Sequence, residues 1–230
     1  MIKSVFITGH TSGLGQGLKQ CFADNGYEVF GLSKSCANDE RNLNADLHKL
    51  EDLNDKLDKF LENKKFDICF LNAGILGEIQ KATNIDKEDM LRCFSINVIS
   101  TKIIIDAMIR CGSCNTFISI SSGASNRAYD GWLNYCISKS SLRQMISCYA
   151  IENKDMHFIS LAPGIIKTKM QDEIIKYNPL VFSSIQKFKD LYDSNPTPIQ
   201  VSKNIFKKLN LLLSLDSGSF IDLREISNDN

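Results

Sequence analysis

The sequence TGHTSGLG at residues 8–15 joins a short apolar run to a helix-like segment. The run before this junction, Ser4–Thr8, has the residue types of a buried strand, and Leu14–Asn25 after it places apolar residues three and four positions apart. Glycines in such a turn let backbone amides approach a diphosphate closely, and the helix amino terminus supplies partial positive charge. The junction therefore predicts a nucleotide site, although many strand–helix turns contain glycines without binding a ligand.

The same alternation of strand and helix continues along the chain. Further strand-like runs are Glu28–Leu32, Phe66–Asn72, Thr116–Ser121, His157–Ala162 and Ser219–Leu223. Apolar residues at helical spacing predict helices at Leu47–Asn63, Lys87–Cys111, Asn134–Asn153 and Pro198–Leu215. Apolar strands separated by helices predict an α/β fold, a doubly wound parallel sheet of six to seven strands with helices on both faces, in one domain spanning residues 1–230. The irregular segment 170–198 is too long for a tight crossover and is predicted to be a substrate lid.

The composition favours an ordinary globular protein. Hydrophobic residues make up 43% and charged residues 23%, and the formal net charge is zero, so no nucleic-acid or membrane partner is expected. The eight cysteines are scattered and mostly lie in apolar runs, which favours reduced, buried thiols. The pair Cys111 and Cys114 has metal-ligand spacing, but without a second pair no metal site is expected. Since the chain enters its first strand directly after Met1, with no apolar leader, we expect a cytoplasmic protein.

A tyrosine and a lysine provide the most specific chemical signal. Tyr135 and Lys139 are four residues apart in a predicted helix, which puts them on one face, a turn apart. A free tyrosine, with a pKa of about 10, is a weak acid near neutral pH, and a nearby ammonium favours the phenolate and lowers that pKa. Ser122 follows a predicted strand, where its hydroxyl could bond a substrate oxygen, and Ser121 beside it is more simply a turn residue.

These motifs, in this order, resemble the short-chain dehydrogenase/reductase family, a Rossmann-type family, from Thr8 to Thr168. The matched elements are the Thr-Gly-x3-Gly-x-Gly turn, an Asn-Ala-Gly triplet, the serine–tyrosine interval, the Tyr-x3-Lys pair and a Pro-Gly-x3-Thr turn. The resemblance implies that Ser122 bonds the carbonyl oxygen, Tyr135 is the acid/base, Lys139 holds the ribose, and Asn97 holds a relay water. The resemblance further implies cofactor contacts by Gly9, Thr11, Ser12, Gly13, Leu14, Gly15, Ser33, Lys34, Asp46, Leu47, Asn72, Ala73, Gly74, Tyr135, Lys139, Pro163, Gly164, Ile166 and Thr168.

The cofactor is predicted to be NADP rather than NAD. Dinucleotide folds that prefer NAD place a carboxylate at the end of the second strand, which would repel a 2′-phosphate. Here Ser33 takes that position and Lys34 follows it, so a hydroxyl and an ammonium would attract the phosphate, unless Lys34 is only a solvated loop charge. By resemblance, Asp46 follows a third strand and bonds the adenine, although it could equally cap a helix. The short link to that strand suggests that a peripheral helix of the family is missing.

The predicted function is hydride transfer between NADPH and a small-molecule carbonyl or alcohol. The alternative is a non-catalytic NADP-binding sensor or scaffold, and an epimerase of the extended branch has no room for its second domain. The carboxyl-terminal sequence Gly218–Leu223 resembles sepiapterin/benzil-reductase-like members and departs from the common tetrameric pattern. A homo-oligomer, either a dimer or a tetramer, is expected, and the departure favours a dimer with contacts through the long helices. Trp132 is a candidate for the wall of the substrate pocket.

Overall fold

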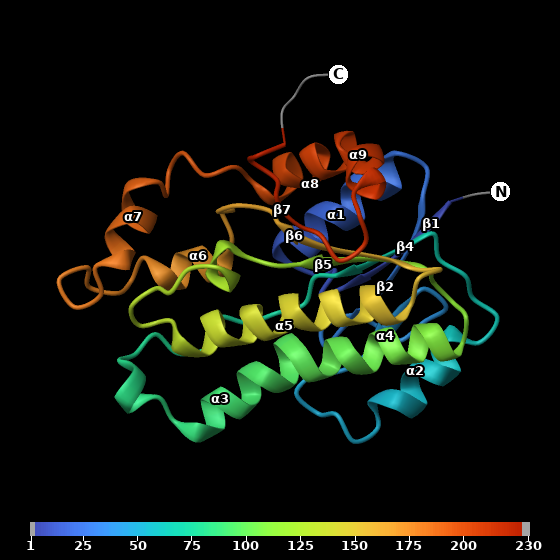
Figure 1. Ribbon diagram of the computed structural model, residues 1–230, viewed down its shortest axis with the longest axis horizontal. Helices are drawn as coiled ribbons and strands as arrows, with labels where there is room; N and C mark the ends of the chain where they lie inside the picture. The colour runs from blue at the N-terminus through green and yellow to red at the C-terminus, as the bar shows by residue number, and fades with distance from the viewer. Residues whose placement is uncertain (1–2, 227–230) are drawn as a thin grey trace.

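A seven-stranded parallel sheet forms the centre of the molecule in the computed structural model, which describes residues 3–226. The strand order is β3-β2-β1-β4-β5-β6-β7, and every neighbouring pair is parallel (Figure 1). All residues of β1 and β4 are buried, because helices cover both faces of the sheet. The strands are β1 (Ser4–Thr8), β2 (Glu28–Ser33), β3 (Asn42–Asn44), β4 (Ile68–Leu71), β5 (Thr116–Ile120), β6 (His157–Ala162) and β7 (Phe220–Asp222).

The predicted doubly wound parallel sheet is confirmed. The runs Ser4–Thr8 and His157–Ala162 are strands over their full predicted lengths, and the other four predicted runs contain strands within one or two residues of their predicted ends. The strand β3 is short and mostly polar, so hydrophobicity alone does not reveal it. No helix lies between β2 and β3, as the short link predicted.

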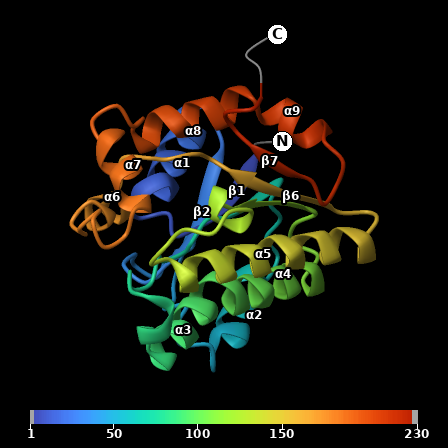
Figure 2. The same cartoon turned by 60° about the vertical axis from the view of Figure 1, so that its left-hand side comes forward.

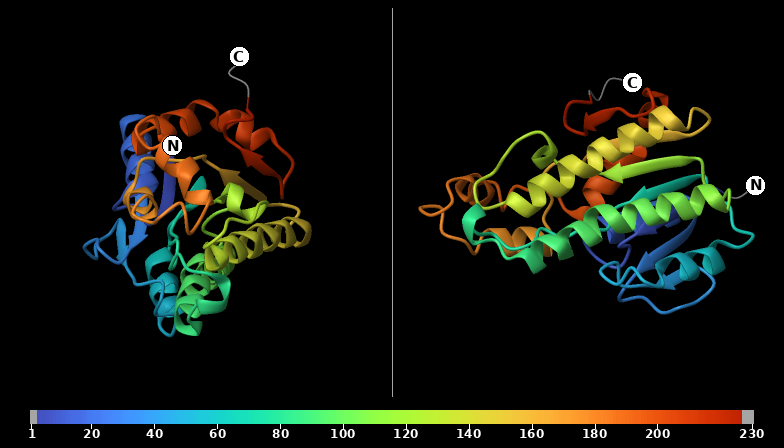
Figure 3. Two further views of the ribbon diagram at one scale, coloured as in Figure 1. Left: turned by 90° about the vertical axis from the view of Figure 1, so that its left-hand side faces the viewer. Right: turned by 60° about the horizontal axis from the view of Figure 1, so that its bottom comes forward.

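Two helical layers enclose the sheet. The helices α1 (Gly13–Asp24), α8 (Pro198–Lys207) and α9 (Leu209–Ser214) cover one face. The helices α2 (Leu53–Leu61), α4 (Ser100–Arg110) and α5 (Leu133–Glu152) cover the other, with α4 and α5 side by side (Figures 2 and 3). Each face has its own apolar cluster: one contains Phe117 and Phe158, on the side of α4 and α5, and the other contains Phe22 of α1 and Phe70 of β4. Within residues 3–226, no helix has the length and apolar character needed to cross a bilayer.

Three predicted helices differ in detail from the structure. The predicted helix Leu47–Asn63 begins only at Leu53, because residues 47–52 form turns. The predicted helix Lys87–Cys111 is divided into α3 (Lys87–Phe94), a π-helical turn at Ser95–Ile99, and α4. The predicted helix Pro198–Leu215 changes direction at Lys208, between α8 and α9. Periodicity does not reveal such local breaks, since the apolar spacing continues through them.

The segment 170–198 contains two short helices rather than irregular chain. These are α6 (Lys169–Ile174) and α7 (Ser184–Asp190), and both lie beyond the carboxyl ends of the strands, at the left in Figure 1. A third apolar cluster forms there, apart from the two under the sheet, and it includes Ile79, Trp132, Ile174, Phe182, Ile185 and Phe188. Both helices therefore lie at the carboxyl end of the sheet, the end at which such folds bind ligands. The strand order reverses between β1 and β4.

Candidate active site

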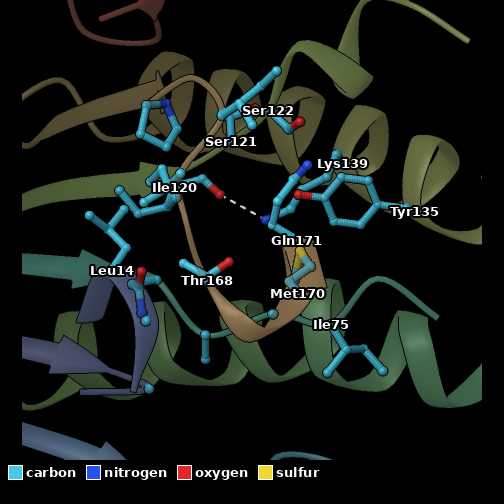
Figure 4. Close-up of a pocket in the computed structure, with 18 of the residues that line it drawn as sticks. Leu14, Ile75, Ile120, Ser121, Ser122, Tyr135, Lys139, Thr168, Met170 and Gln171 are labelled. Atoms are coloured by element: carbon cyan, nitrogen blue, oxygen red, sulfur yellow. Dashed lines mark hydrogen bonds between the residues drawn. The ribbon is translucent and has the colours of Figure 1, made fainter. Parts of the chain in front are cut away.

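A cavity of about 880 Å³ opens at the carboxyl ends of the strands. It is lined by the loops that follow β1, β2, β4, β5 and β6, and by residues of α6 and α7. Figure 4 shows Ser122, Tyr135 and Lys139 gathered together there, with Leu14 at the opposite side. The cavity brings together almost all of the predicted site residues, namely Gly9, Thr11, Ser12, Gly13, Leu14, Ser33, Lys34, Asp46, Leu47, Asn72, Ala73, Gly74, Ser122, Tyr135, Lys139, Pro163, Gly164, Ile166 and Thr168. Gly15 and Asn97 do not line it.

The loop at residues 9–15, the predicted phosphate loop, has the geometry to receive an anion. Gly9 and Gly13 have φ angles of +69° and +53°, values that residues other than glycine rarely adopt. Ser12 precedes α1 without a side-chain capping bond, so the first amides of the helix are available to a ligand. Gly15 acts one layer behind the cavity, because a Cβ there would lie 2.2 Å from the carbonyl oxygen of Gly9. The residues present therefore fit a dinucleotide diphosphate.

The Asn-Ala-Gly triplet after β4, residues 72–74, is hydrogen-bonded to Thr8 at the end of β1. The amides of Asn72 and Ala73 both donate to the Thr8 hydroxyl, each at 2.9 Å, and the Asn72 side-chain amide donates to the Thr8 carbonyl at 2.9 Å. These hydrogen bonds between Thr8 and Asn72 hold the loop after β1 next to the loop after β4. Gly74 follows, between the Asn97 side chain and the Lys139 ammonium.

The end of β2 carries a cluster of hydroxyls. The Thr11 hydroxyl lies 2.7 Å from that of Ser33 and 2.8 Å from that of Ser35, and the exposed Lys34 stands between the two serines in sequence. The sequence did not predict these hydrogen bonds between hydroxyls, because they join the loop after β1 to the end of β2 and the loop after it. Within the described part of the chain, no carboxylate forms an ion pair with Lys34.

Asp46 lines the cavity but does not cap a helix. Its carboxylate accepts a hydrogen bond from the His48 amide at 3.1 Å, which closes a local turn, and α2 begins only at Leu53. The alternative reading of Asp46 as a helix cap is therefore wrong. Leu47 is buried beside it and lines the same end of the cavity.

Tyr135 and Lys139 face the same space, as their spacing on α5 predicted. The Lys139 ammonium lies 5.7 Å from the centre of the Tyr135 ring and donates to the Ile120 carbonyl at 2.8 Å (Figure 4). Burial raises the pKa of Tyr135 to about 12, and a hydrogen bond with Ser122 opposes this rise. Burial also lowers the pKa of Lys139 to about 8. In the ligand-free protein, burial therefore outweighs the lowering of the tyrosine pKa that we expected from Lys139.

Asn97 is fully buried in the π-helical turn, behind the cavity. Its side-chain oxygen accepts from the Ile75 amide at 2.8 Å, and its amide group donates to the Ile75 carbonyl and the Ser138 hydroxyl, each at 2.9 Å. These bonds lie within a local widening of the helix, a feature that often marks functional positions. No hydrogen bond joins Asn97 to Lys139 among the described residues, so the predicted relay depends on an intervening water beside Gly74 and stays a prediction.

The other side of the cavity is built by residues that sequence reasoning largely missed. Tyr129, Phe188 and the buried Gln171 line it with Trp132, which was the one candidate proposed from the sequence. Arg224 also lines it, against the Pro-Gly turn after β6, where a Cβ on Gly164 would lie 3.2 Å from the arginine Cδ. No motif marks these residues, since each reaches the cavity only through long-range packing.

Comparisons with known proteins agree with this arrangement. A family model described as short chain dehydrogenase matches residues 3–178. Benzil reductase ((S)-benzoin forming) from Bacillus subtilis is 26% identical over 205 residues, covering 82% of this chain and 84% of that protein. Diacetyl reductase [(S)-acetoin forming] from Staphylococcus epidermidis is 27% identical over 194 residues, covering 76% of this chain and 75% of that protein.

Solved structures share the fold at low sequence identity. A short chain dehydrogenase/reductase from Saccharomyces cerevisiae has a TM-score of 0.82 at 21% identity, covering 97% of this chain and 96% of that chain. ElxO with NADP bound has a TM-score of 0.77 at 22% identity and covers 97% of both chains. A 3-ketoacyl-(acyl-carrier-protein) reductase from Brucella melitensis complexed with NADH has a TM-score of 0.74 at 22% identity and covers 96% of both chains. The fold thus accepts both nicotinamide dinucleotides.

Proposed function

Because the chain belongs to the short-chain dehydrogenase/reductase family of nicotinamide-dependent oxidoreductases, we propose that it is an NADP-dependent reductase of ketones with Tyr135 as its acid/base. The convergence of Ser122, Tyr135 and Lys139 in the cavity that also contains the phosphate loop carries this proposal. When bound, a reduced nicotinamide supplies the hydride that adds to the carbonyl carbon. The chain itself supplies binding, orientation and the proton.

The preference for NADP is supported by the end of β2. A 2′-phosphate there would meet the Lys34 ammonium and the hydroxyls of Thr11, Ser33 and Ser35, with no carboxylate replacing Ser33 to repel it. Asp46 and Leu47 would hold the adenine, and the phosphate loop would hold the diphosphate. On the nicotinamide side, the turn at Pro163–Thr168 would fix the ring that faces the substrate.

The proton would come from Tyr135. Since burial raises the pKa of this phenol to about 12, it is protonated at neutral pH and is in the state needed to donate to a developing alkoxide. The Ser122 hydroxyl would bond the substrate oxygen and keep it beside the phenol. Lys139, buried beneath the ring, would hold the ribose and, when charged, oppose the cost of a transient phenolate.

The substrate is proposed to be a ketone with an aromatic or other flat apolar group. Tyr129, Trp132 and Phe188 line the cavity next to Tyr135, and Trp132 lies edge-on to the Tyr135 ring at 5.9 Å. The similarity to a benzil reductase favours a vicinal diketone flanked by aryl groups. The segment 170–198 would be the substrate lid, since its α7 carries Phe188.

Replacing Tyr135 by Phe tests the proposal directly. Tyr135→Phe keeps the ring but removes the acid, so turnover of benzil with NADPH is expected to fall by about 10²–10⁴-fold while NADPH binding is retained. Steady-state kinetics and a thermal-shift titration with NADPH and NADH measure the two effects. A wild-type protein that binds NADPH but turns over no member of a panel of ketones and diketones would instead be a sensor or scaffold.

We also propose that the protein is a cytosolic homo-oligomer. All eight cysteines are free thiols, which suits a reducing compartment. Ile99, directly before α4, and Ile151, near the end of α5, are 42% and 68% exposed, so a second copy packed on the α4–α5 layer would cover apolar surface. Light scattering coupled to size-exclusion chromatography gives the mass, and a monomer at micromolar concentration would contradict the proposal.

A further inference from the structure

The carboxylate of Asp130 binds the start of α7, more than fifty residues further along the chain. The Ser183 amide donates to its Oδ2 at 2.6 Å, and the Ser184 amide donates to its Oδ1 at 2.9 Å. The Ser183 hydroxyl adds a bond to Oδ2 at 3.2 Å, and the Ser184 hydroxyl bonds the Asp130 carbonyl at 3.2 Å. Both carboxylate oxygens are thus used by two consecutive residues, a bidentate contact that fixes direction as well as position.

The next residue, Gly131, brings the segment 170–198 into direct contact with the loop that precedes α5. Gly131 has a φ of +82°, and a Cβ there would lie 2.8 Å from the Phe182 ring and 2.9 Å from the Ile79 side chain. Only glycine therefore permits this approach. Phe182 is buried against the loop although it lies just before α7. The contact is consequently a packed junction and not a single surface hydrogen bond.

The contact of Asp130 and Gly131 with the start of α7, called the junction below, determines where an aromatic wall lies. The wall consists of Tyr129, Trp132 and Phe188: Trp132 stacks on Phe188 at 4.8 Å with 24° between the rings, and Tyr129 lies 5.2 Å from Trp132. Phe188 belongs to α7, so the position of α7 sets one side of the wall. A second contact holds the far end of α7, because the buried side chain of Gln171 donates a hydrogen bond to the Phe188 carbonyl at 3.4 Å.

We propose that Asp130 is a positioning residue for substrate selection: by holding α7 against the loop that leads into α5, it keeps the aromatic wall closed beside Tyr135. The wall would stack a planar aryl group next to the reacting carbonyl. Loss of the Asp130 contact would release Phe188 from Trp132 and weaken binding of aryl ketones, while small ketones, which do not reach the wall, would be unaffected. The substrate part of this inference rests on the proposed function, whereas the junction itself does not.

The junction can be tested without any substrate, because Trp132 is the only tryptophan in the chain. In Asp130→Ala, the emission of Trp132 is expected to shift to longer wavelength, and the Stern–Volmer constant for acrylamide quenching is expected to rise about threefold or more as the buried indole meets water. The matched control is Asp190→Ala, at the other end of α7, where the carboxylate accepts a bond from Gln186 of the same helix. This control should keep the wild-type emission.

Kinetics then test the link to substrate size. For Asp130→Ala, KM for benzil is expected to rise about tenfold with kcat within about twofold, and KM for diacetyl is expected to stay within about twofold of wild type. If Asp130→Ala fails to give a wild-type circular dichroism spectrum, Asp130→Asn, which keeps one carbonyl acceptor, provides the same test with a smaller change in both readouts.

The outcomes separate the two proposals. A folded Asp130 variant with unchanged Trp132 emission and quenching overturns the junction, and an equal rise in KM for benzil and diacetyl overturns its role in substrate selection. A shifted emission in a protein that turns over no carbonyl compound supports the junction and contradicts the proposed function. A shifted emission together with a KM effect confined to benzil supports both.

Discussion

The two halves of the cavity are built in different ways. The cofactor half, as proposed, consists of loops that directly follow β1, β2, β3, β4 and β6, and it depends on backbone approach at glycines and on bonds such as those from Asn72 and Ala73 to Thr8. The substrate half consists of the loop before α5, the helices α6 and α7, and Arg224, joined by side-chain packing. A local motif specifies the first half, and long-range contacts specify the second. Substitutions in the two halves should therefore have separable effects on cofactor and on substrate.

The largest effect is expected for Gly15→Ala in the cofactor half. A Cβ at Gly15 would lie 2.2 Å from the Gly9 carbonyl oxygen, so the phosphate loop must shift. We expect NADPH affinity, measured by calorimetry, to fall by about 100-fold or more. The control is Gly26→Ala, whose Cβ would meet nothing within 4 Å although its φ of +80° strains the backbone. If Gly15→Ala bound NADPH like wild type, the cofactor half would not depend on this close approach.

A smaller effect, confined to the substrate, is expected for Phe188→Ala. Removing this ring takes away the partner of Trp132 in the aromatic wall, so kcat/KM for benzil should fall about tenfold. The Kd for NADPH should stay within about twofold of wild type, because Phe188 reaches the cavity from α7, outside the loops proposed to bind the cofactor. An equal loss of NADPH affinity would show that the two halves are coupled.

Lys34→Ala tests which part of the cofactor half distinguishes NADPH from NADH. The exposed ammonium has no carboxylate partner in residues 3–226, so its removal takes away attraction for a 2′-phosphate at little cost to the fold. We expect the Kd for NADPH to rise about fivefold and that for NADH to stay constant, with the difference shrinking at high salt. Equal weakening of both cofactors would mean that Lys34 is only a solvated loop charge.

The burial of Lys139 should also make the stability of the protein depend on pH. Burial lowers the pKa of Lys139 to about 8 from its ordinary value of 10.5, so between these values the unfolded chain binds more protons than the folded one, and stability rises with pH. In ligand-free protein, wild type should gain about 1–2 kcal/mol between pH 8 and 9.5 relative to Lys139→Met. Urea unfolding at the two pH values measures this. No difference in slope would mean that Lys139 is not desolvated.

The sequence predicts the cofactor half well, because each feature there depends on neighbours in the chain. The strand before Gly9, the turn and the helix after it occupy one short stretch, and Tyr135 and Lys139 share one helix. The π-helical turn around Asn97 and the turn closed by Asp46 were missed, since each involves hydrogen bonds between side chain and backbone that apolar spacing does not reveal.

The substrate half could not be predicted in the same way. Phe188, Gln171 and Arg224 carry no motif, and their apolar or polar character fits a solvent-facing loop as well as a cavity wall. Only the packing of α7 on the loop around Gly131 brings Phe188 beside Trp132. Trp132 was found in advance because it lies three residues before Tyr135 in the chain.

The contact between Arg224 and Gly164 has a practical consequence for handling the protein. Arg224 pairs with Asp222 and rests on the Pro-Gly turn, and the buried Lys208 donates to the Ile226 carbonyl at 2.6 Å. The tail of the chain is thus a structural support of the pocket. An affinity tag is better placed before Lys3, at the opposite end of β1 from the cavity, and trimming the chain back to Leu223 should loosen the turn at Pro163 and Gly164, where we propose that the nicotinamide binds.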